Sequence, residues 1–341
     1  MLFNGEVLVA GLGSIGERHV GNLQALGQTN VTVLRRAERP VRTLEAGSFR
    51  TVTSADEAFA RTPSAVIIAT PSATHIPLLT RAIDAGIPAM VEVPAATSID
   101  SLGDVAARAH ANDVPVLVAH NLRFHPCLQQ VRESVQRGDV GDVLYSQAQF
   151  GEFLPGSHTW EDYRTRYEAR ADLGGGAIYT SLHELDHAVW LFGKADAVIG
   201  VTRTRSLDVD VEDTAMLIIE HASGVLSQIT LDFVQRPYRR WLQVVGSEGT
   251  LEWEFLSNEV RRFTTKNHSW EKVFSAPGYD AGDTYVDELR HFARVVRGEE
   301  APVVDVSHAL HVLAVAYAAH QSSATGRKIS VHPLPFLEQL R

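Results

Sequence analysis

Short apolar runs alternate with stretches of helical periodicity along the first third of the chain. The apolar runs, which we expect to form strands, cover residues 7–10, 30–34, 65–69, 89–93 and 116–119. The stretches of helical periodicity between them cover residues 14–26, 74–85 and 98–112. Runs that are apolar throughout are typical of strands buried on both faces. This alternation predicts an α/β fold, a doubly wound parallel sheet with helices on its two faces.

The pattern changes beyond residue 120. A connecting helix is expected at residues 126–137, and strand-like runs joined by short turns follow it. These runs cover residues 142–150, 195–204, 214–220, 224–233, 240–245 and 249–255, and two closing helices are expected at 284–297 and 306–325. Such spacing is typical of antiparallel meanders. We therefore expect a parallel α/β domain at 1–122 and an α+β domain with a largely antiparallel open sheet at 123–341. The C-terminal helix is a candidate to pack back on the first domain.

The turn after the first apolar run has glycines with the spacing G-x-G-x-x-G, at Gly11, Gly13 and Gly16. Gly11 allows a sharp turn out of the strand, Gly13 lets the backbone approach a pyrophosphate, and Gly16 lets the helix lie close to the strand. Ser14 and Ile15 begin that helix, whose amide groups and dipole favour a phosphate. The position of the motif between strand and helix predicts a dinucleotide-binding Rossmann domain.

The end of the second strand bears on which dinucleotide binds. An NAD-selective site usually has an acidic residue here, about 20 residues beyond the glycines, that holds the ribose 2′-hydroxyl. This chain has Arg35 and Arg36 instead. Guanidinium groups hold a 2′-phosphate, so the sequence favours NADP(H), with NAD(H) as the alternative. Because ligands bind at the carboxyl ends of parallel strands, one rim is expected to contain Gly11, Arg35, Thr70, Glu92 and Asn121.

Composition limits the partners and the compartment. Of 341 residues, 45% are hydrophobic and 21% are charged, as in globular proteins, and the formal net charge is −10. That charge argues against nucleic acid and anionic membranes as partners. We find no run of about 18 apolar residues and no signal-peptide pattern, and expect a cytoplasmic protein. The single cysteine, Cys127, is expected to pack rather than to act as a nucleophile.

A second group of polar residues surrounds a helix entered through Gly174-Gly175-Gly176. His183 and Asp186 stand three residues apart on that helix, hence on one face. An imidazole oriented by a carboxylate is a suitable acid-base unit for a substrate hydroxyl. The segment His183-Glu-Leu-Asp-His187 also matches H-E-x-x-H, a zinc-hydrolase pattern with Glu184 as base. The dinucleotide-binding first half favours coincidence, and we predict no metal site.

The segment before this helix combines aromatic and basic residues that suit a polyhydroxylated ligand. Aromatic rings offer a stacking face, and guanidinium groups bind hydroxyl or phosphate oxygens. The predicted substrate-binding residues are Arg123, His158, Trp160, Tyr163, Arg164, Tyr167 and Arg236. Packing in the core is an equally weighted alternative for the aromatic residues.

Together, these motifs make the chain similar to the Gfo/Idh/MocA family of nicotinamide-dependent sugar and cyclitol oxidoreductases over nearly its whole length. The motifs that carry the resemblance are Gly11-Leu-Gly-Ser-Ile-Gly16, Ala69-Thr-Pro71 with His75, Val91-Glu-Val-Pro94, Arg123-Phe124, Gly174-Gly175-Gly176 and His183-x-x-Asp186. The resemblance implies a substrate cleft between the domains. It also implies assembly through the exposed face of the second sheet, as a homodimer or homotetramer. The expected cofactor-binding residues outside the glycine turn are Arg35, Arg36, Thr70, Pro71, His75, Glu92 and Asn121, with Glu92 assigned to the nicotinamide ribose by family position.

Two positions depart from the family pattern. The family usually has Glu-Lys-Pro where this chain has Glu92-Val93-Pro94, and that lysine polarises the reacting oxygen and passes its proton. The family also commonly has an aspartate four residues before the catalytic histidine, where this chain has Tyr179. The predicted catalytic residues are therefore His183, Asp186 and Tyr179, in an active site that lacks the family lysine.

Three functions are consistent with these residues. The first, which we favour, is an NAD(P)-dependent oxidoreductase that transfers hydride to or from a hydroxyl or carbonyl carbon of a sugar, sugar nucleotide or cyclitol. The second is an enzyme that uses tightly bound NAD(P) for a transient oxidation in a net non-redox reaction such as epimerisation, elimination or glycoside cleavage. The third is a non-catalytic sensor of a dinucleotide or sugar.

Overall fold

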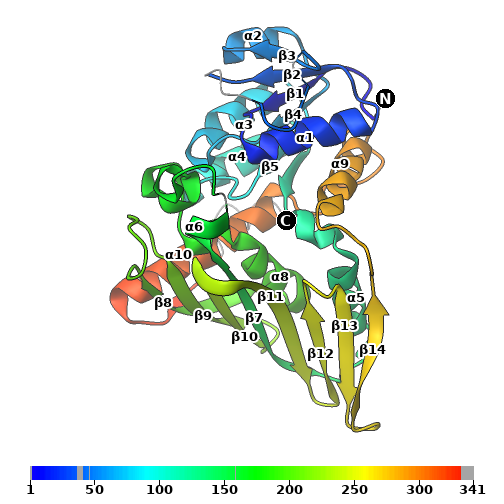
Figure 1. Ribbon diagram of the computed structural model, residues 1–341, viewed down its shortest axis with the longest axis vertical. Helices are drawn as coiled ribbons and strands as arrows, with labels where there is room; N and C mark the ends of the chain where they lie inside the picture. Colours follow the sequence, from blue (N-terminus) through cyan, green and yellow to red (C-terminus); the bar gives the residue numbers. More distant parts are fainter. Residues whose placement is uncertain (1, 37–40, 46, 158, 332–341) are drawn as a thin grey trace. The chain divides into compact units, whose positions relative to one another are not determined.

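The computed structural model describes residues 2–36, 41–45, 47–157 and 159–331 of the chain. Contacts between residues divide the chain into two compact units. The described part of the first unit comprises residues 2–121 and 282–310, and that of the second comprises residues 122–281 and 311–331. Each unit contains its own sheet (Figure 1).

The first unit is built on a six-stranded parallel sheet with the order β3-β2-β1-β4-β5-β6. Its strands are β1 (Val7–Ala10), β2 (Val31–Leu34), β3 (Arg50–Val52), β4 (Ala65–Ile68), β5 (Ala89–Glu92) and β6 (Val116–Ala119). Its helices are α1 (Ser14–Ala25), α2 (Ala55–Ala60), α3 (His75–Asp84), α4 (Ile99–Ala111) and α9 (Asp283–Val296), with a 3-10 turn at Ser72–Thr74. The strand order reverses beside β1, so this is the doubly wound sheet that the sequence predicts.

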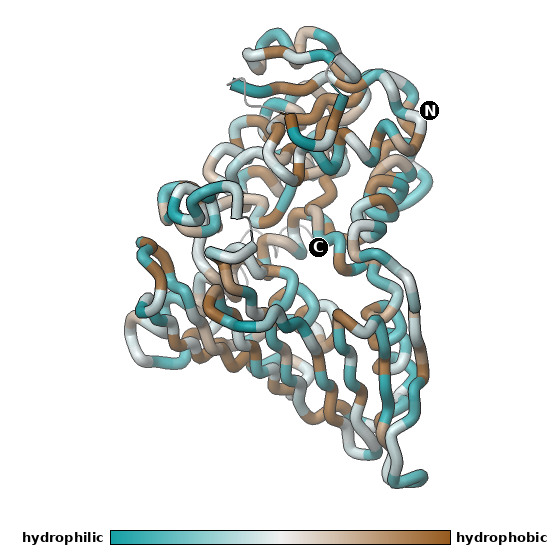
Figure 2. Tube along the Cα trace, in the orientation of Figure 1, coloured by the Kyte–Doolittle hydropathy of each residue, from teal (hydrophilic) through white to brown (hydrophobic). Residues whose placement is uncertain are grey.

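Alternate residues of these strands face the two helical layers. Val7, Val9 and Val33 belong to the core on the side of α1 and α9. Helix α3 contacts β4 and β5. The residues of β1 and β4 are buried throughout, and Figure 2 shows this sheet as largely hydrophobic. Burial on both faces is the reason that the strands read as continuous apolar runs.

Helix α9 belongs to the first unit although residues 122–281 separate it from the other elements there. Leu289 and Phe292 insert into the core of this unit, and the Phe292 ring lies 5.7 Å from that of Phe3. The contacts divide the chain after Asn121 and group residues 282–310 with the first unit, and the domain bounds 1–122 and 123–341 stay a prediction. The local pattern showed that α9 is amphipathic; it did not show which core its apolar face would fill.

The second unit contains a nine-stranded sheet with the order β14-β13-β12-β11-β7-β10-β9-β8-β15. Its strands are β7 (Val143–Phe153), β8 (Ala195–Arg203), β9 (Thr214–His221), β10 (Leu226–Asp232), β11 (Val234–Gly246), β12 (Gly249–Glu254), β13 (Glu259–Thr264), β14 (Ser269–Ser275) and β15 (Ile329–Ser330). The pair β7 and β10 is parallel and the other neighbours are antiparallel. This mixed, largely antiparallel sheet confirms the predicted fold class.

Helices accompany the second sheet. They are α5 (Pro126–Gln136), α6 (Leu154–Ser157), α7 (Ala177–Thr180), α8 (Leu182–Phe192) and α10 (Val306–Thr325), with 3-10 turns at Asn121–Phe124, Tyr163–Thr165, Tyr167–Ala169 and Ala171–Leu173. Helix α8 contacts β7 and β10. The division between the two units falls within α10, after Leu310.

The sequence missed the strands at the ends of the second sheet. β13, β14 and β15 were not expected, and β11 begins at Val234 rather than at residue 240. β13 and β14 are joined by charged pairs, Arg262 with Glu271 at 2.7 Å and Lys272 with Glu259. Exposed edge strands bury little apolar surface, so their sequences lack the alternation that identifies a strand.

Among the described residues, every helix is too short or too polar to span a bilayer. The cytoplasmic location expected from the sequence stays a prediction.

The place of α9 in the first core can be tested with Phe292→Ala. Phe292 is 0% exposed, so the substitution leaves a cavity and should lower the free energy of unfolding by about 3–5 kcal/mol. Urea denaturation of the full chain measures the change. The control Leu256→Ala removes a side chain that is 66% exposed and should cost below about 1 kcal/mol. Equal effects of the two substitutions would contradict the assignment of α9 to a core.

Candidate functional site

The glycine turn between β1 and α1 is determined by close backbone contacts. Gly11 has a φ of +99°, and a Cβ at this position would lie 2.4 Å from the carbonyl oxygen of Ala69. A Cβ on Gly16 would lie 2.3 Å from the carbonyl oxygen of Gly11. Either side chain would force the strand and the helix apart, so the packing of the protein itself requires these two glycines.

Gly13 differs because the space beside it is open. Its φ of −79° suits any residue, and a Cβ there would meet no atom of the described residues within 4 Å. It is the exposed N-cap of α1, ahead of Ser14 and Ile15, and α1 has no side-chain cap. The first amide groups of a helix lack intrahelical acceptors and carry a partial positive charge. The arrangement fits the pyrophosphate of a dinucleotide.

The residues that follow the parallel strands share one edge of the sheet. Arg35 is half-buried and Arg36 exposed after β2, and the Arg35 amide donates a 3.0 Å hydrogen bond to the carbonyl of Val52 in β3. Thr70 and Pro71 follow β4. This edge contains backbone and guanidinium hydrogen-bond donors at the place where we predict from the sequence that a dinucleotide binds.

His75, at the start of α3, contacts two backbone carbonyls at the same edge of the sheet. Its Nδ1 lies 3.0 Å from the carbonyl oxygen of Pro94 and its Nε2 2.7 Å from that of Thr70. Burial lowers the pKa of His75, although both carbonyls favour the charged ring. A neutral ring can donate only one of the two hydrogen bonds. The ring is 1% exposed, so this geometry favours a structural contribution of His75 to the rim.

Glu92 ends β5 and pairs with a histidine of α1. Its Oε1 lies 2.6 Å from Nε2 of His19, which is fully buried. At the end of β6, the Asn121 side-chain amide donates a 2.7 Å hydrogen bond to Oγ1 of Thr284 in α9. These two contacts join the carboxyl ends of β5 and β6 to the helices beside them.

In the second unit, Tyr179 lies against a histidine of α10. Its ring stacks on that of His320 with centroids 5.0 Å apart. Nε2 of His320 lies 3.7 Å from Glu212, which also accepts a 2.9 Å hydrogen bond from the Ile178 amide. Burial, and then the charge of Glu212, raise the pKa of Tyr179 to about 12. Tyr179 is therefore a hydrogen-bond donor at neutral pH and is unsuited to act as a general base.

The triple glycine is surrounded by the protein's own atoms. A Cβ on Gly175 would lie 2.3 Å from the carbonyl oxygen of Tyr167, and one on Gly176 would lie 2.6 Å from the Glu212 carboxylate. Gly174 and Gly176 both have a positive φ. Close contacts within the protein therefore require glycine at positions 175 and 176, and the left-handed backbone favours it at 174.

Arg123 and Asp186 form a buried ion pair. The guanidinium Nε and Nη2 donate to the two carboxylate oxygens at 2.8 and 2.7 Å, and the side chains are 4% and 0% exposed. Arg123 also lies over the ring of Trp190. This geometry favours a structural role for both residues, whereas the sequence predicted Asp186 as the partner of His183 and Arg123 as a substrate residue. His183 itself is half-buried on α8.

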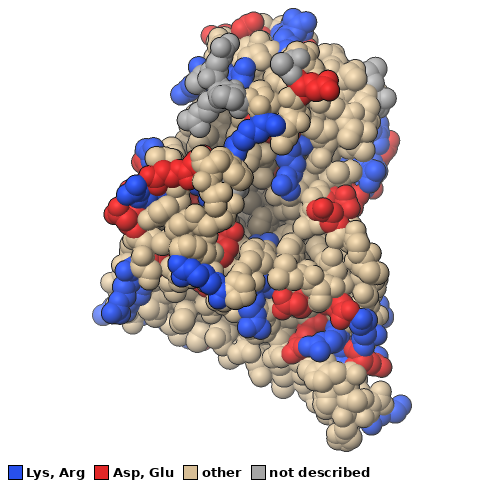
Figure 3. All heavy atoms as spheres, in the orientation of Figure 1, with Lys and Arg blue, Asp and Glu red and all other residues tan. Residues whose placement is uncertain are grey.

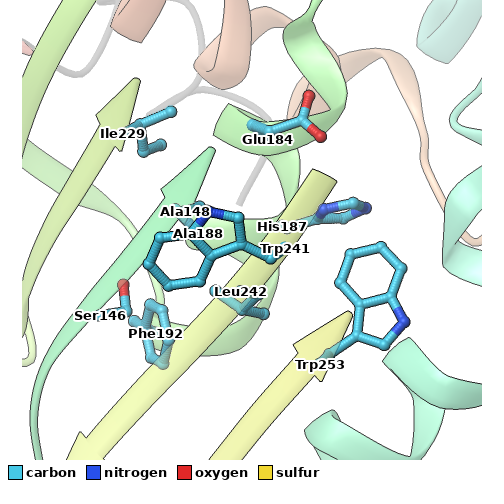
Figure 4. Close-up of a pocket in the computed structure, with 10 residues that line it drawn as sticks. All are labelled: Ser146, Ala148, Glu184, His187, Ala188, Phe192, Ile229, Trp241, Leu242 and Trp253. Carbon is cyan, nitrogen blue, oxygen red and sulfur yellow. The ribbon is translucent and has the colours of Figure 1, made fainter. Parts of the chain in front are cut away.

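The other members of the H-E-x-x-H segment face the interior of the second unit. The carboxylate of Glu184 pairs with Arg240 of β11 at 2.7 Å and is buried, as is His187. A cavity of about 10 Å³ lies between α8 and the sheet, with room for about one water molecule. Its lining includes Glu184, His187, Trp241 and Trp253 (Figure 4). A space of this size serves packing and cannot hold a sugar.

Apart from the buried Arg123, the predicted substrate residues that the structure describes lie at or near the surface of the second unit. Tyr163 and Arg164 lie at a solvent-open hollow of about 450 Å³ that is lined by Arg164, Thr165, Ala169, Arg170, Asp208, Val209 and Asp210. Arg164 pairs there with Asp162 at 2.7 Å and with Asp208 at 3.4 Å. Both signs of charge are also interspersed over the face seen in Figure 3. Trp160, Tyr167 and Arg236 are exposed, and His158 lies outside the described residues.

Several buried or ion-paired polar residues of the two units were not predicted from the sequence. They are His19 and Glu288 in the first unit and Glu212 and His320 in the second. Glu288 left a signal, because it stands four residues before Phe292 and hence on the apolar face of its helix. His19, Glu212 and His320 gave no such signal in the sequence, since their partners are remote along the chain.

Two family models match the chain. Residues 6–120 match the model described as "Oxidoreductase family, NAD-binding Rossmann fold", and residues 128–252 match the "GFO/IDH/MocA C-terminal domain". The D-apiose dehydrogenase of Paraburkholderia graminis is 26% identical over 282 residues, covering 79% of this chain and 73% of that protein. The D-xylose 1-dehydrogenase (NADP(+)) 2 of Haloferax volcanii is 25% identical over 269 residues, covering 78% of this chain and 80% of that protein.

A solved structure is similar over almost the whole length. GenD2 from gentamicin A biosynthesis, solved in complex with NAD, is 26% identical with a TM-score of 0.82, and the match covers 97% of both chains.

The structural role of the Arg123 and Asp186 pair predicts the effect of Asp186→Asn. Loss of the carboxylate charge leaves a buried guanidinium poorly compensated, so the free energy of unfolding should fall by about 3–5 kcal/mol. The control is Asp84→Asn, which breaks the pair of Asp84 with Arg108, both 49% exposed, and should cost below about 1 kcal/mol. Thermal or urea unfolding measures both. An Asp186→Asn variant of wild-type stability that has lost turnover would instead assign Asp186 to catalysis.

Proposed function

Because the chain belongs to the Gfo/Idh/MocA family of oxidoreductases, we propose that it transfers hydride between a nicotinamide cofactor and a hydroxyl or carbonyl carbon of a sugar, sugar nucleotide or cyclitol. The observation that carries the proposal is the open space at Gly13, beside two glycines that the protein's own packing requires. Dehydrogenases of apiose and xylose among the relatives support a sugar as the substrate. Bound nicotinamide would accept or donate the hydride.

The strand order supports an orientation for the cofactor. With the pyrophosphate at the turn after β1, Arg35 and Arg36 at the end of β2 would hold the 2′-phosphate of the adenosine half. Thr70, Pro71 and Glu92, at the ends of β4 and β5, would hold the nicotinamide half. We propose NADP(H) as the preferred cofactor. NAD(H) is the alternative, since the similar GenD2 was solved with NAD.

We propose that His183 exchanges the proton of the substrate hydroxyl and that Tyr179 donates a hydrogen bond to the substrate. The raised pKa of Tyr179 keeps its hydroxyl protonated, which suits donation. Val93, where the family usually has lysine, can neither polarise the substrate oxygen nor accept its proton. Loss of one proton-transfer group lowers catalysis by about 10²–10⁴-fold, while orientation of the reactants contributes separately. A transient oxidation without net redox change is the second candidate, because Val93 stands where the family's ordinary dehydrogenases usually have lysine.

Assembly with a second copy of the chain is also part of the proposal. Ile199 and Val201 of β8 lie beside Ile218 and Met216 of β9, and all four are between 41% and 58% exposed. Cross-strand neighbours of this kind form a continuous apolar area, which is unusual on a monomer. A homodimer through this face would bury it.

The cofactor proposal predicts opposite effects for two neighbouring glycines. Gly13→Val places its side chain in open space, so the free energy of unfolding should change by below about 1 kcal/mol. The dissociation constant for NADP⁺ should rise at least tenfold, about 1.4 kcal/mol, because the side chain occupies the pyrophosphate space. Gly16→Ala should instead destabilise the fold, since its Cβ meets the Gly11 carbonyl.

Calorimetric titration with NADP⁺, together with urea denaturation, separates these outcomes. Unchanged binding of NADP⁺ to a folded Gly13→Val variant would contradict the cofactor site. Equal affinity of the wild type for NADP⁺ and NAD⁺ would contradict the role given to Arg35 and Arg36.

The proton-transfer proposal predicts that His183→Ala lowers kcat by about 10²–10⁴-fold and leaves NADP⁺ binding within about twofold. Turnover is followed by nicotinamide absorbance with D-apiose, D-xylose and other sugars and cyclitols. The matched variant is Val93→Lys, which adds the amine that the family usually has. It should raise dehydrogenase turnover because the lysine restores a proton acceptor. Unchanged turnover of His183→Ala removes this residue from the mechanism, and a loss in Val93→Lys indicates different chemistry at that position.

A further inference from the structure

Glu288 is a buried carboxyl group without a hydrogen-bond partner. It lies on α9 in the first unit and is 0% exposed. Neither of its oxygens has a hydrogen-bond donor or acceptor among the described residues. Leaving a carboxylate in this state would cost several kcal/mol, so the group must be protonated or must be compensated by something that binds nearby.

The charged group that acts on Glu288 is Glu92, which is held by other elements of the first unit. The charge of Glu92 on β5 reaches it, and with burial, which is the larger cause, it raises the pKa of Glu288 well above the ordinary value. From α1, the buried His19 holds Glu92 at 2.6 Å, and its ring lies edge-on to Tyr285 of α9 with centroids 6.0 Å apart. One helical turn before Glu288, Thr284 accepts the hydrogen bond from Asn121.

A proton, rather than a metal ion, fits this cluster. His19 and Glu92 are in contact, and no group of three His, Cys, Asp or Glu side chains in the described part of the chain has an arrangement that could hold a metal. Repulsion from a neighbouring carboxyl group favours the neutral form of a buried carboxyl group that has no partner of its own. Glu92 has His19 as its partner, which leaves the neutral form to Glu288.

We propose that Glu288 is held as a neutral carboxylic acid and releases its proton to solvent when a positively charged nicotinamide ring binds at the end of β5. This proposal rests on the proposed function, because it takes the nicotinamide half to lie toward Glu92. The cation offsets the repulsion between the two carboxylates, so Glu288 ionises. An uncharged, reduced ring gives no such compensation, and the proton remains on Glu288. Glu288 is a positioning residue that sets the charge of the site through Glu92.

Proton counting on the full chain tests this proposal. Calorimetric titrations with NADP⁺ and with NADPH, each in two buffers of different ionisation enthalpy at pH 7–9, give the protons released on binding. NADP⁺ should release more protons than NADPH, with a difference of up to one. The ratio of the two dissociation constants should then change by up to about tenfold per pH unit in favour of NADP⁺ as the pH rises. The 2′-phosphate is common to both ligands, so its own titration cancels.

Three substitutions test which residue releases the proton. Glu288→Gln keeps the shape of the side chain without a titrating group and should abolish the difference between NADP⁺ and NADPH. Asp287→Asn, on the exposed side of the same helix where Asp287 pairs with Arg290, should preserve it. Glu92→Gln removes the neighbouring charge and should move the release of the proton to lower pH.

The results separate failure of this inference from failure of the proposed function. Equal proton counts for the two ligands in the wild type overturn the inference while leaving cofactor binding intact. A difference that survives in Glu288→Gln assigns the proton to another residue and also overturns it. If Glu288→Gln does not fold, an unchanged pH window in Glu92→Gln overturns the inference in its place. Absence of binding by either ligand would overturn the proposed function itself.

Discussion

The close approach of α1 to β1 is the contact on which the first unit depends. Gly16 lies against the carbonyl of Gly11, and Gly11 lies against Ala69, at distances that no Cβ could occupy. The helix N-terminus is thereby held at the carboxyl edge of the parallel sheet, with its free amides beside the open space at Gly13. Two glycines thus position the helix, and the third leaves room for a ligand.

The same packing explains why α9 returns to the first unit. With α1 drawn against the sheet, the surface beside it is apolar, and Leu289 and Phe292 of α9 cover it. The helix carries Glu288 into that interior, close enough for the charge of Glu92 to raise its pKa. The hydrophobic contact therefore buries a carboxyl group, and burial is the main reason that the pKa of Glu288 lies above its ordinary value.

The second unit shows that residues typical of catalysis can serve packing. The helix with the H-E-x-x-H pattern uses Glu184 to pair with Arg240 and Asp186 to pair with Arg123, both inside the unit. The triple glycine before it accommodates neighbouring backbone and the Glu212 carboxylate. His183 and Tyr179, which are half-buried, are the residues of this region that we propose to contact the substrate.

The sequence by itself determined the parallel sheet, the glycine turn and the family, because these depend on local spacing: strand periodicity, turn geometry and residues a few positions apart. It also showed where the strand pattern changes, beyond residue 120. It could not assign α9 to the first unit, or pair Arg123 with Asp186 or Glu92 with His19. Those depend on which apolar faces meet and which charges are buried together, and only the tertiary structure decides that, because the partners are brought together by burial and not by their distance along the chain.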